Sequence, residues 1–395
     1  FFFWLCRSDE VGREPEVRVG VMPLSKDTLQ LLEVDGSLVQ GPVYDQYWPY
    51  IEALPHETLQ LMYRTMAVVR ELDIEAGNLQ RQGQMALWVP AIGQEACQVG
   101  SALASRPQDS IFPAYREHSV ARLRGVSMLH IVRMLRGLTH GGWDPKTHNN
   151  FHLYTLVIGS HTLHATGYAM GIGLDGSVAT GDVNTDEISI VYFGDGATSQ
   201  GDTHEAMVFA QSYQAPVLFF LQNNHWAIST PVRVQSRTPL AQRAAGYGIP
   251  SRQIDGNDAL ISYAVTREMA DQARSGVGPQ FIEALTYRIG AHTTSDDPTK
   301  YRDEDELRFW TERDPITRFE AFLRAQGEQD SFFQEVGEQA RDEVSDLRKE
   351  VLALPTPEPS EMFKHVYSAD HAPLAAEAEW FADYEGSFVE EGPGA

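Results

Sequence analysis

Two short, continuous hydrophobic runs stand near the middle of the chain, ISIVYF at residues 188–193 and PVLFFL at residues 216–221. Runs of this length without polar alternation are typical of parallel strands that are buried on both faces. The segment between them predicts one helix, opened by the capping pair Asp202 and Glu205, with apolar positions at Ala206, Val208, Phe209 and Ala210. The pattern therefore predicts a strand-helix-strand unit of an α/β fold.

The hydrophobic pattern predicts further elements on both sides of this unit. Residues 58–78 place apolar side chains near one helical face, and FIEALTY at 281–287 predicts another buried strand. A charged, helix-like stretch at 303–352 precedes the proline-rich LPTPEPS and an acidic end. We expect an N-terminal arm (1–55), one α/β domain with a mostly parallel sheet and helices on both faces (56–345), and a C-terminal helical and acidic tail (346–395).

Each of the two central strands is followed by a turn that carries potential magnesium ligands. Gly194, Asp195 and Gly196 follow the first strand, and Asn223 and Asn224 follow the second. Ligands of open parallel sheets bind at the carboxyl ends of strands, so we expect these turns to converge on one ligand. The glycines permit a tight turn and close approach to phosphate, and carboxylate and amide oxygens suit Mg²⁺. The alternative is an ordinary turn and an ordinary strand exit.

The GDG turn and the NN pair, with residues 197–222 between them, together resemble the thiamine diphosphate motif. From about Leu59 to Tyr384 the chain resembles the alpha subunit of the thiamine-dependent decarboxylase component of 2-oxo acid dehydrogenase complexes, most closely the branched-chain type. The supporting motifs occur in the family's order. They are RQGQMALW (81–88), AYRE (114–117), AISTP (227–231), GYGIP (246–250), DGND (255–258) and EALTYRIGAHTTSDDPTKYR (283–302).

The resemblance assigns roles to individual residues, with thiamine diphosphate and Mg²⁺ as cofactors. Metal ligands would be Asp195, Asn224 and the backbone carbonyl of Trp226. His292 would be the catalytic histidine, on a loop that orders around the cofactor. Leu87 and Tyr115 would line the substrate pocket. Cofactor contacts would come from Tyr115, Arg116, Leu156, Ile158, Gly194, Asp195, Gly196, Ala197, Asn224, Arg288 and His292.

Three residues around the second turn depart from the family pattern. Gln222 stands where an arginine is frequent, His225 where glycine is common, and Trp226 where tyrosine is common. A backbone carbonyl at position 226 does not depend on the side chain, so we expect the metal site to be kept. Gln222 places one cofactor contact in doubt.

The activity implied by the resemblance is oxidative decarboxylation of branched-chain 2-oxo acids such as 2-oxoisovalerate. The acyl group would pass to the lipoyl group of an acyltransferase partner. The glutamate that activates the cofactor would come from a beta subunit in an α2β2 assembly, since only one sheet domain fits this chain. Alternatives are a pyruvate or acetoin dehydrogenase alpha subunit, a non-catalytic subunit of such a complex, and a magnesium-dependent phosphohydrolase. A dinucleotide-binding protein is disfavoured because GDGATSQG lacks the G-x-G-x-x-G spacing.

Composition removes several other classes of function. The formal charge of -24 argues against nucleic acid as a partner, because phosphate backbones require clustered Lys and Arg. The apolar run FFFWLC at the start is too short to cross a bilayer, so we predict no membrane partner. The only cysteines are Cys6 and Cys97, which suits a reducing cytoplasm without disulfides.

A group of histidines suggests a transition-metal site but matches no common zinc spacing. We instead expect an active-site loop that runs into a helix from Thr162 to Gly173. The histidines are at positions 140, 148, 152, 161 and 164.

Overall fold

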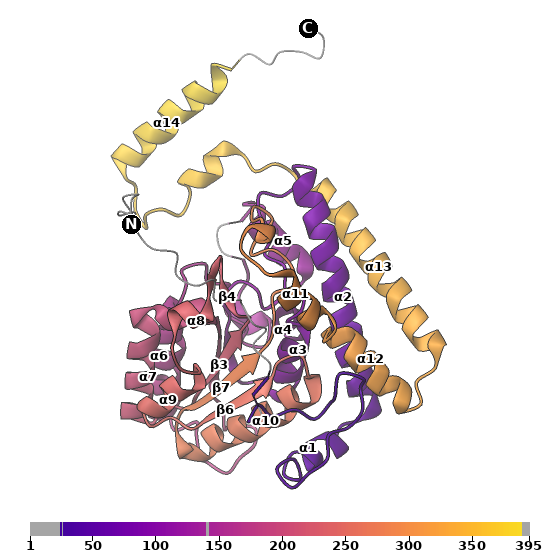
Figure 1. The fold of residues 1–395 in the computed structure, drawn as a ribbon. Helices are drawn as coiled ribbons and strands as arrows, with labels where there is room; N and C mark the ends of the chain where they lie inside the picture. Colours follow the sequence, from indigo (N-terminus) through magenta and orange to yellow (C-terminus); the bar gives the residue numbers. More distant parts are fainter. Residues whose placement is uncertain (1–23, 26, 140–141, 389–395) are drawn as a thin grey trace, which may run out of the picture.

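The computed structural model describes residues 24–25, 27–139 and 142–388, and a parallel sheet of five strands forms its centre (Figure 1). The strand order is β1-β2-β3-β7-β6, and every neighbouring pair is parallel. The predicted α/β fold is therefore confirmed. The strands are β1 (Ser110–Phe112), β2 (Ser189–Gly194), β3 (Val217–Asn223), β7 (Gln280–Leu285) and β6 (Ser251–Asp255).

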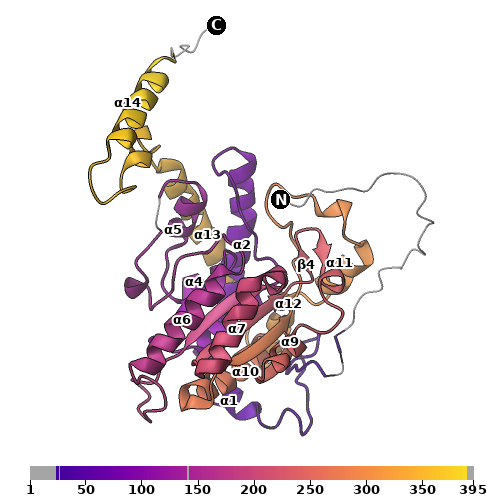
Figure 2. The ribbon, with the colours of Figure 1, turned by 90° about the vertical axis from the view of Figure 1, so that its left-hand side faces the viewer.

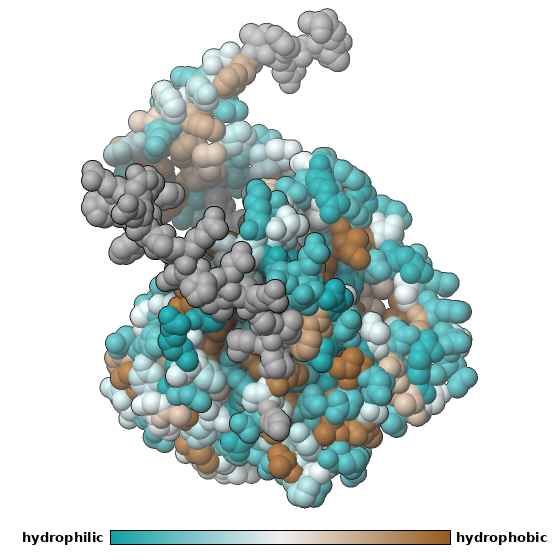
Figure 3. Space-filling view, in the orientation of Figure 1, coloured by the Kyte–Doolittle hydropathy of each residue, from teal (hydrophilic) through white to brown (hydrophobic). Residues whose placement is uncertain are grey.

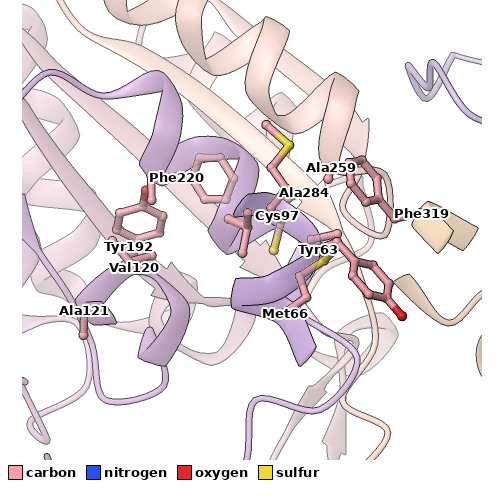
Figure 4. Packing of buried hydrophobic residues seen from close by; sticks show 14 of the residues in the cluster. Tyr63, Met66, Cys97, Val120, Ala121, Tyr192, Phe220, Ala259, Ala284 and Phe319 are labelled. Carbon is pink, nitrogen blue, oxygen red and sulfur yellow. The ribbon is translucent and has the colours of Figure 1, made fainter. Parts of the chain in front are cut away.

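The two predicted hydrophobic runs become β2 and β3, and both are buried on both faces. Alternate side chains enter opposite cores, so Tyr192 and Phe220 lie in one hydrophobic cluster and Phe193 and Phe219 lie in the other. Figure 4 shows part of the first cluster, where Tyr192 and Phe220 lie near Cys97. A continuous apolar run is the expected signature of a strand covered on two sides.

Helices cover both faces of the sheet, as the sequence predicted. Figure 2 shows α6 and α7 side by side over one face. The predicted helix at 58–78 is longer than expected, and the helix predicted from Thr162 begins two residues earlier. The first cluster holds α2 (His56–Arg81), α3 (Glu95–Ala104), α4 (His118–Leu123), α5 (Met128–Leu135) and α10 (Ala259–Gln272), and the second holds α6 (Ser160–Leu174), α7 (Gly201–Tyr213) and α9 (Ala241–Gly246).

The predicted capping of α7 is wrong. The residue before the helix is Gln200, which makes no side-chain cap, and Asp202 lies inside the first turn. A carboxylate there favours the positive end of the helix dipole without capping it. Val208 and Phe209 are exposed, because the face that packs on the sheet carries Thr203, Ala206, Met207 and Ala210.

The described part of the N-terminal arm is attached to the sheet. Leu31 and Leu32 are fully buried, and their backbone N–H groups donate to Asp258 Oδ2 at 2.6 and 2.7 Å. The same carboxylate caps α10 through its other oxygen. Arg318 forms an ion pair with Asp255 at 2.6 Å and donates to the carbonyl of Leu32. This segment, which also contains α1 (Trp48–Glu52), therefore belongs to the folded body.

The charged stretch at 303–352 forms three helices. They are α11 (Glu304–Thr311), α12 (Pro315–Ala325) and α13 (Asp330–Ala353), and α13 packs along α2 (Figure 1). Helix α13 spans the predicted boundary between residues 345 and 346 and ends at Ala353. Beyond it, η5 (Pro359–Phe363) and α14 (Ala372–Gly386) lie apart from the body and contain no buried residue.

The surface of the body in Figure 3 is mainly hydrophilic, with scattered apolar residues. Within the described residues, none of the helices combines the length and the apolar character that crossing a bilayer requires.

Candidate active site

A cavity of about 170 Å³ lies at the carboxyl ends of β2 and β3, where the two polar turns were expected to converge. The two turns meet at this cavity through Gly194, Asp195, Gly196 and Asn224, whereas Asn223 lines a second cavity. Of the residues assigned from the resemblance, Leu87 and Leu156 do not line this cavity, and Leu156 is 59% exposed. Arg288 is fully buried behind it. The cavity does bring together Tyr115, Arg116, Ile158, Gly194, Asp195, Gly196, Ala197, Asn224, Trp226 and His292.

Asp195 begins the short helix η2 (Asp195–Ser199), directly after the last residue of β2. Its side chain is buried, and Gln235 Nε2 donates to its Oδ2 at 3.0 Å. Burial raises the pKa of Asp195 to about 6. Gly196 is needed for close packing, because a Cβ there would lie 2.9 Å from the Cβ of Ala227. Among the described residues, no arginine or lysine forms an ion pair with this carboxylate.

The second turn presents Asn224 and Trp226 to the same cavity. Asn224 Nδ2 donates to Gln94 Oε1 at 3.2 Å, and the Trp226 N–H donates to Asn224 Oδ1 at 3.3 Å. Between them His225 has φ of +71°, a left-handed conformation that glycine adopts most easily. This conformation would suit the glycine that the resemblance leads us to expect at position 225, and the histidine adopts it at a conformational cost. Trp226 continues into a two-stranded hairpin, β4 (Trp226–Ala227) and β5 (Thr230–Pro231).

Arg116 and Arg288 converge on His292 from separate loops. Each guanidinium has a nitrogen 3.3 Å from His292 Nδ1. A guanidinium only donates, so Nδ1 is the acceptor and the ring proton resides on Nε2. Burial and the two arginines lower the pKa of His292 to about 3, which keeps the imidazole neutral. The site therefore concentrates positive charge around a neutral histidine.

The loop that carries His292 is held by hydrogen bonds of its own. Asp296 Oδ2 accepts from the His292 N–H at 2.7 Å and from the Tyr301 hydroxyl at 2.5 Å. Arg288 donates to the Tyr301 hydroxyl at 2.9 Å and to the carbonyls of Trp226 and Ile228. These contacts connect the loop after β7 to the hairpin after β3.

Sequence reasoning missed several polar residues in the cavity wall. Glu117 accepts from Gln222 Nε2 at 2.6 Å, and burial raises the pKa of Glu117 to about 7. Gln222 thus binds a buried carboxyl of this chain. His161 donates through Nε2 to the Tyr192 carbonyl at 2.7 Å. Gln94 has a buried Nε2 without a partner. Glu117 lies within the AYRE motif, Gln222 directly precedes the NN pair and His161 belongs to the histidine group, whereas Gln94 lies in none of the recognised motifs.

The side chains fit a divalent cation bound to a diphosphate. Asp195, Asn224 and the Trp226 carbonyl offer the hard oxygen donors that Mg²⁺ prefers. Arg288 already donates to that carbonyl at 3.1 Å, but a carbonyl oxygen has two lone pairs and can also face a cation. Arg116 and Arg288 supply the forked donors that phosphate oxygens require. The donor set therefore suits both groups.

A transition-metal site is not supported. Across residues 24–25, 27–139 and 142–388, no three or more His, Cys, Asp or Glu side chains are arranged to hold an ion. His140 lies outside the described residues. His161 is buried and His164 is exposed, so the predicted helix separates these histidines.

Comparisons with known proteins agree with this geometry. Residues 63–360 match the family model described as "Dehydrogenase E1 component". The chain is 42% identical over 361 residues to 3-methyl-2-oxobutanoate dehydrogenase subunit alpha of Mycobacterium tuberculosis, covering 91% of this chain and 94% of that protein. It is 40% identical to pyruvate dehydrogenase E1 component subunit alpha of Acholeplasma laidlawii, covering 80% and 90%. The Bacillus subtilis pyruvate dehydrogenase subunit is 34% identical, covering 86% and 88%.

The family match covers most of the folded body, including β2, β3 and β7 with their functional turns. The family depends on thiamine diphosphate, which agrees with the donor set of the cavity. The chain therefore belongs to the dehydrogenase E1 component family, as the alpha subunit of a 2-oxo acid dehydrogenase.

Proposed function

We propose that this subunit catalyses the oxidative decarboxylation of branched-chain 2-oxo acids, such as 2-oxoisovalerate, with thiamine diphosphate and Mg²⁺. The main supporting observation is the convergence of Asp195, Asn224, Arg116 and His292 on one cavity at the sheet edge. The acyl product passes to the lipoyl group of an acyltransferase partner. We further propose a cytoplasmic location and a role in branched-chain amino acid catabolism.

The roles of the chain's residues follow from their chemistry. Asp195, Asn224 and the carbonyl of Trp226 hold Mg²⁺, while Arg116 and Arg288 neutralise the diphosphate. When bound, thiamine diphosphate supplies the carbanion that attacks the 2-oxo carbon and accepts the electrons released with CO₂. Gly194, Gly196 and Ala197 carry no side chain larger than a methyl group, which suits a close approach of their backbone to the diphosphate.

His292 acts as a neutral hydrogen-bonding group near the reacting centre. Its Nδ1 accepts from the arginines, so Nε2–H is the donor available to a substrate or diphosphate oxygen. Because the pKa of His292 is lowered to about 3, this donor is kept without a positive charge at working pH. We assign it the stabilisation of developing negative charge.

The apolar part of the cavity supports a preference for aliphatic acyl groups. Ile158, Ala227 and Ile228 line it together with the ring of Tyr115. Branched alkyl chains gain free energy by burial against such side chains, at about 25 cal/mol per Å². Ile158 is also our candidate for the side chain beneath the cofactor rings.

A beta subunit is needed to complete this site. Within the described lining of the cavity the carboxyl groups are Asp195 and Glu117. Glu117 is already bound to Gln222 Nε2 and to the Arg116 N–H, so we assign the cofactor-activating acid to the beta subunit. Ile158, which lines the cavity, is 41% exposed and the neighbouring Val157 is 71% exposed, which suits coverage by an α2β2 partner.

The proposal is tested by co-expression with a beta subunit, followed by CO₂ release from 2-oxoisovalerate and from pyruvate, with and without both cofactors. We expect cofactor-dependent turnover that favours 2-oxoisovalerate. A preference for pyruvate would favour the second candidate, since the A. laidlawii pyruvate dehydrogenase subunit is nearly as similar as the M. tuberculosis protein. Cofactor-independent release, or no turnover of either acid by the assembled enzyme, would contradict the proposal.

A further inference from the structure

Two glutamine side chains, the buried Gln94 and the half-buried Gln235, each form a hydrogen bond with one of the proposed metal ligands. Gln94 precedes α3, and Gln235 is the last residue of the short helix α8 (Val232–Gln235). Gln94 is 1% exposed and lines the cavity, but its side chain does not cap α3. These contacts lie outside every motif recognised in the sequence.

Gln235 determines which oxygen of Asp195 remains available. A carboxylate only accepts, so the group that faces Oδ2 at 3.0 Å must be the amide Nε2–H₂. The amide oxygen of Gln235 then accepts from Ser199 Oγ at 3.3 Å. Arg243 fixes the backbone by donating to the Gln235 carbonyl at 3.1 Å and to the Thr198 carbonyl at 2.7 Å. Oδ2 is thus occupied, and Oδ1 receives no side-chain donor.

Gln94 plays the corresponding part for Asn224. The Trp226 N–H donates to Asn224 Oδ1, which fixes the orientation of the asparagine amide. Its Nδ2 therefore points to Gln94 Oε1, at 3.2 Å. Without that acceptor, the buried Nδ2 donor would lose its partner, and the amide could rotate to place hydrogens where a cation must bind.

We propose that Gln94 and Gln235 are positioning residues for the divalent cation, each holding one ligand side chain so that a ligand oxygen faces the metal. The inference rests on the proposed function, because it assumes the ligands Asp195 and Asn224. Replacing a residue that orients a metal ligand commonly weakens metal affinity by about 10- to 100-fold.

The test uses the co-purified enzyme with its beta subunit, stripped of metal and supplied with thiamine diphosphate. Mn²⁺ is the probe, and bound ion is counted by electron paramagnetic resonance. The variants are Gln94→Met and Gln235→Met, which keep the length but remove the amide, and Gln235→Lys, which adds positive charge. The control is Gln242→Met, an exposed glutamine on α9 with no side-chain hydrogen bond in the described structure.

We expect each of the Met variants at positions 94 and 235 to weaken Mn²⁺ binding about tenfold or more. Gln235→Lys should weaken it further, and the control should match the wild type. At saturating metal kcat should return to within about twofold, and the Tm of the metal-free protein should be unchanged. Mn²⁺ affinities within about twofold of wild type in both Met variants would overturn the inference alone. A wild-type enzyme that binds no Mn²⁺ would overturn the proposed function instead.

Discussion

Two carboxyl groups at the same edge of the sheet have equal burial but opposite surroundings. Asp195 and Glu283 are both 1% exposed. Glu283 accepts from Asn223 Nδ2 at 2.7 Å, from the Ala241 N–H at 2.8 Å and from Gln253 Nε2 at 2.9 Å. Asp195 has one side-chain donor, Gln235. A buried carboxylate with three donors stabilises the fold, whereas one with open acceptor capacity requires a further partner.

The arginines near Glu283 and those near Asp195 also differ in their burial and contacts. Glu283 borders a second cavity, of about 330 Å³, whose arginines Arg233 and Arg237 are exposed and form no ion pair in the described structure. Around the first cavity, Arg116 and Arg288 are buried and converge on His292. Cavity size alone therefore does not identify the active site. The first cavity is the candidate because Asp195, Arg116 and Arg288 are buried there and form no ion pair among the described residues.

The largest effect is expected from Asp195→Asn. The amide still accepts a hydrogen bond from Gln235 but lacks the charge that binds Mg²⁺. A loss of about 4 kcal/mol of metal stabilisation corresponds to about a thousandfold in rate. Steady-state kinetics at saturating substrate would measure this loss, with Tm as the folding control. Retention of metal-dependent turnover near the wild-type level would remove the distinction between Asp195 and Glu283.

A smaller effect is expected from Arg288→Lys. Lysine keeps the charge but loses the planar fork, so thiamine diphosphate binding should weaken by about 10- to 100-fold. Fluorescence titration of the assembled enzyme measures that affinity. The matched control is Arg233→Lys at the second cavity. This variant should leave the affinity for thiamine diphosphate unchanged. Equal weakening in both variants would mean that the two cavities do not differ in the proposed way.

Glu283→Gln should affect stability and leave cofactor binding intact. In glutamine an NH₂ group replaces one of the two accepting oxygens, so at least one of the three donors to Glu283 loses its partner. The unpaired buried groups should lower the free energy of unfolding by about 3 kcal/mol. Chemical denaturation would report the lower free energy of unfolding. The dissociation constants for thiamine diphosphate and Mg²⁺ should match the wild type once the protein is folded. Weaker cofactor binding would assign Glu283 to the active site.

The smallest effect concerns pH and Glu117. Its folded pKa is raised to about 7 from an ordinary value of 4.5, so the folded state retains the proton while the unfolded state releases it. This group's contribution is therefore most favourable below pH 4.5 and is lost as pH rises towards 7. Glu117→Gln removes this loss and should gain about 2 kcal/mol relative to wild type between pH 4.5 and 7. The raised pKa of Glu117 would be excluded if chemical denaturation gave the same difference in unfolding free energy between wild type and Glu117→Gln at every pH.

The sequence predicted those parts of the fold that depend on local pattern. The runs at β2, β3 and β7 are largely apolar because both faces of these strands are buried. This pattern can be recognised in the local sequence without knowing which elements pack against the strand. Strand β6, with the sequence SRQID, was not predicted, because it lies at the edge of the sheet and buries only its last two residues. The predicted cap at Asp202 was wrong because polar residues stand at 198–200 and again at 202–203, so the sequence does not single out the first residue of α7.

The site was predictable where residues lie in one motif and unpredictable where the contact joins distant segments. Asp195, Asn224 and His292 follow strand ends and line one cavity, and Arg288 contacts His292 from behind it. Gln94 contacts Asn224 across 130 positions. The local sequence around such a glutamine does not predict its role, because the role depends on the residue that the fold places beside it.

Each outer strand of the sheet is bridged at one residue by another segment of the same chain. Leu29 pairs with Ile254 on β6, donating to the Gln253 carbonyl and accepting from the Asp255 N–H. Phe151 pairs with Ile111 on β1 at the opposite edge. An open edge is where a strand from another molecule can add on, during either assembly or aggregation. At these positions the folded chain occupies the edges of its own sheet, so strand addition by a second folded molecule is hindered there.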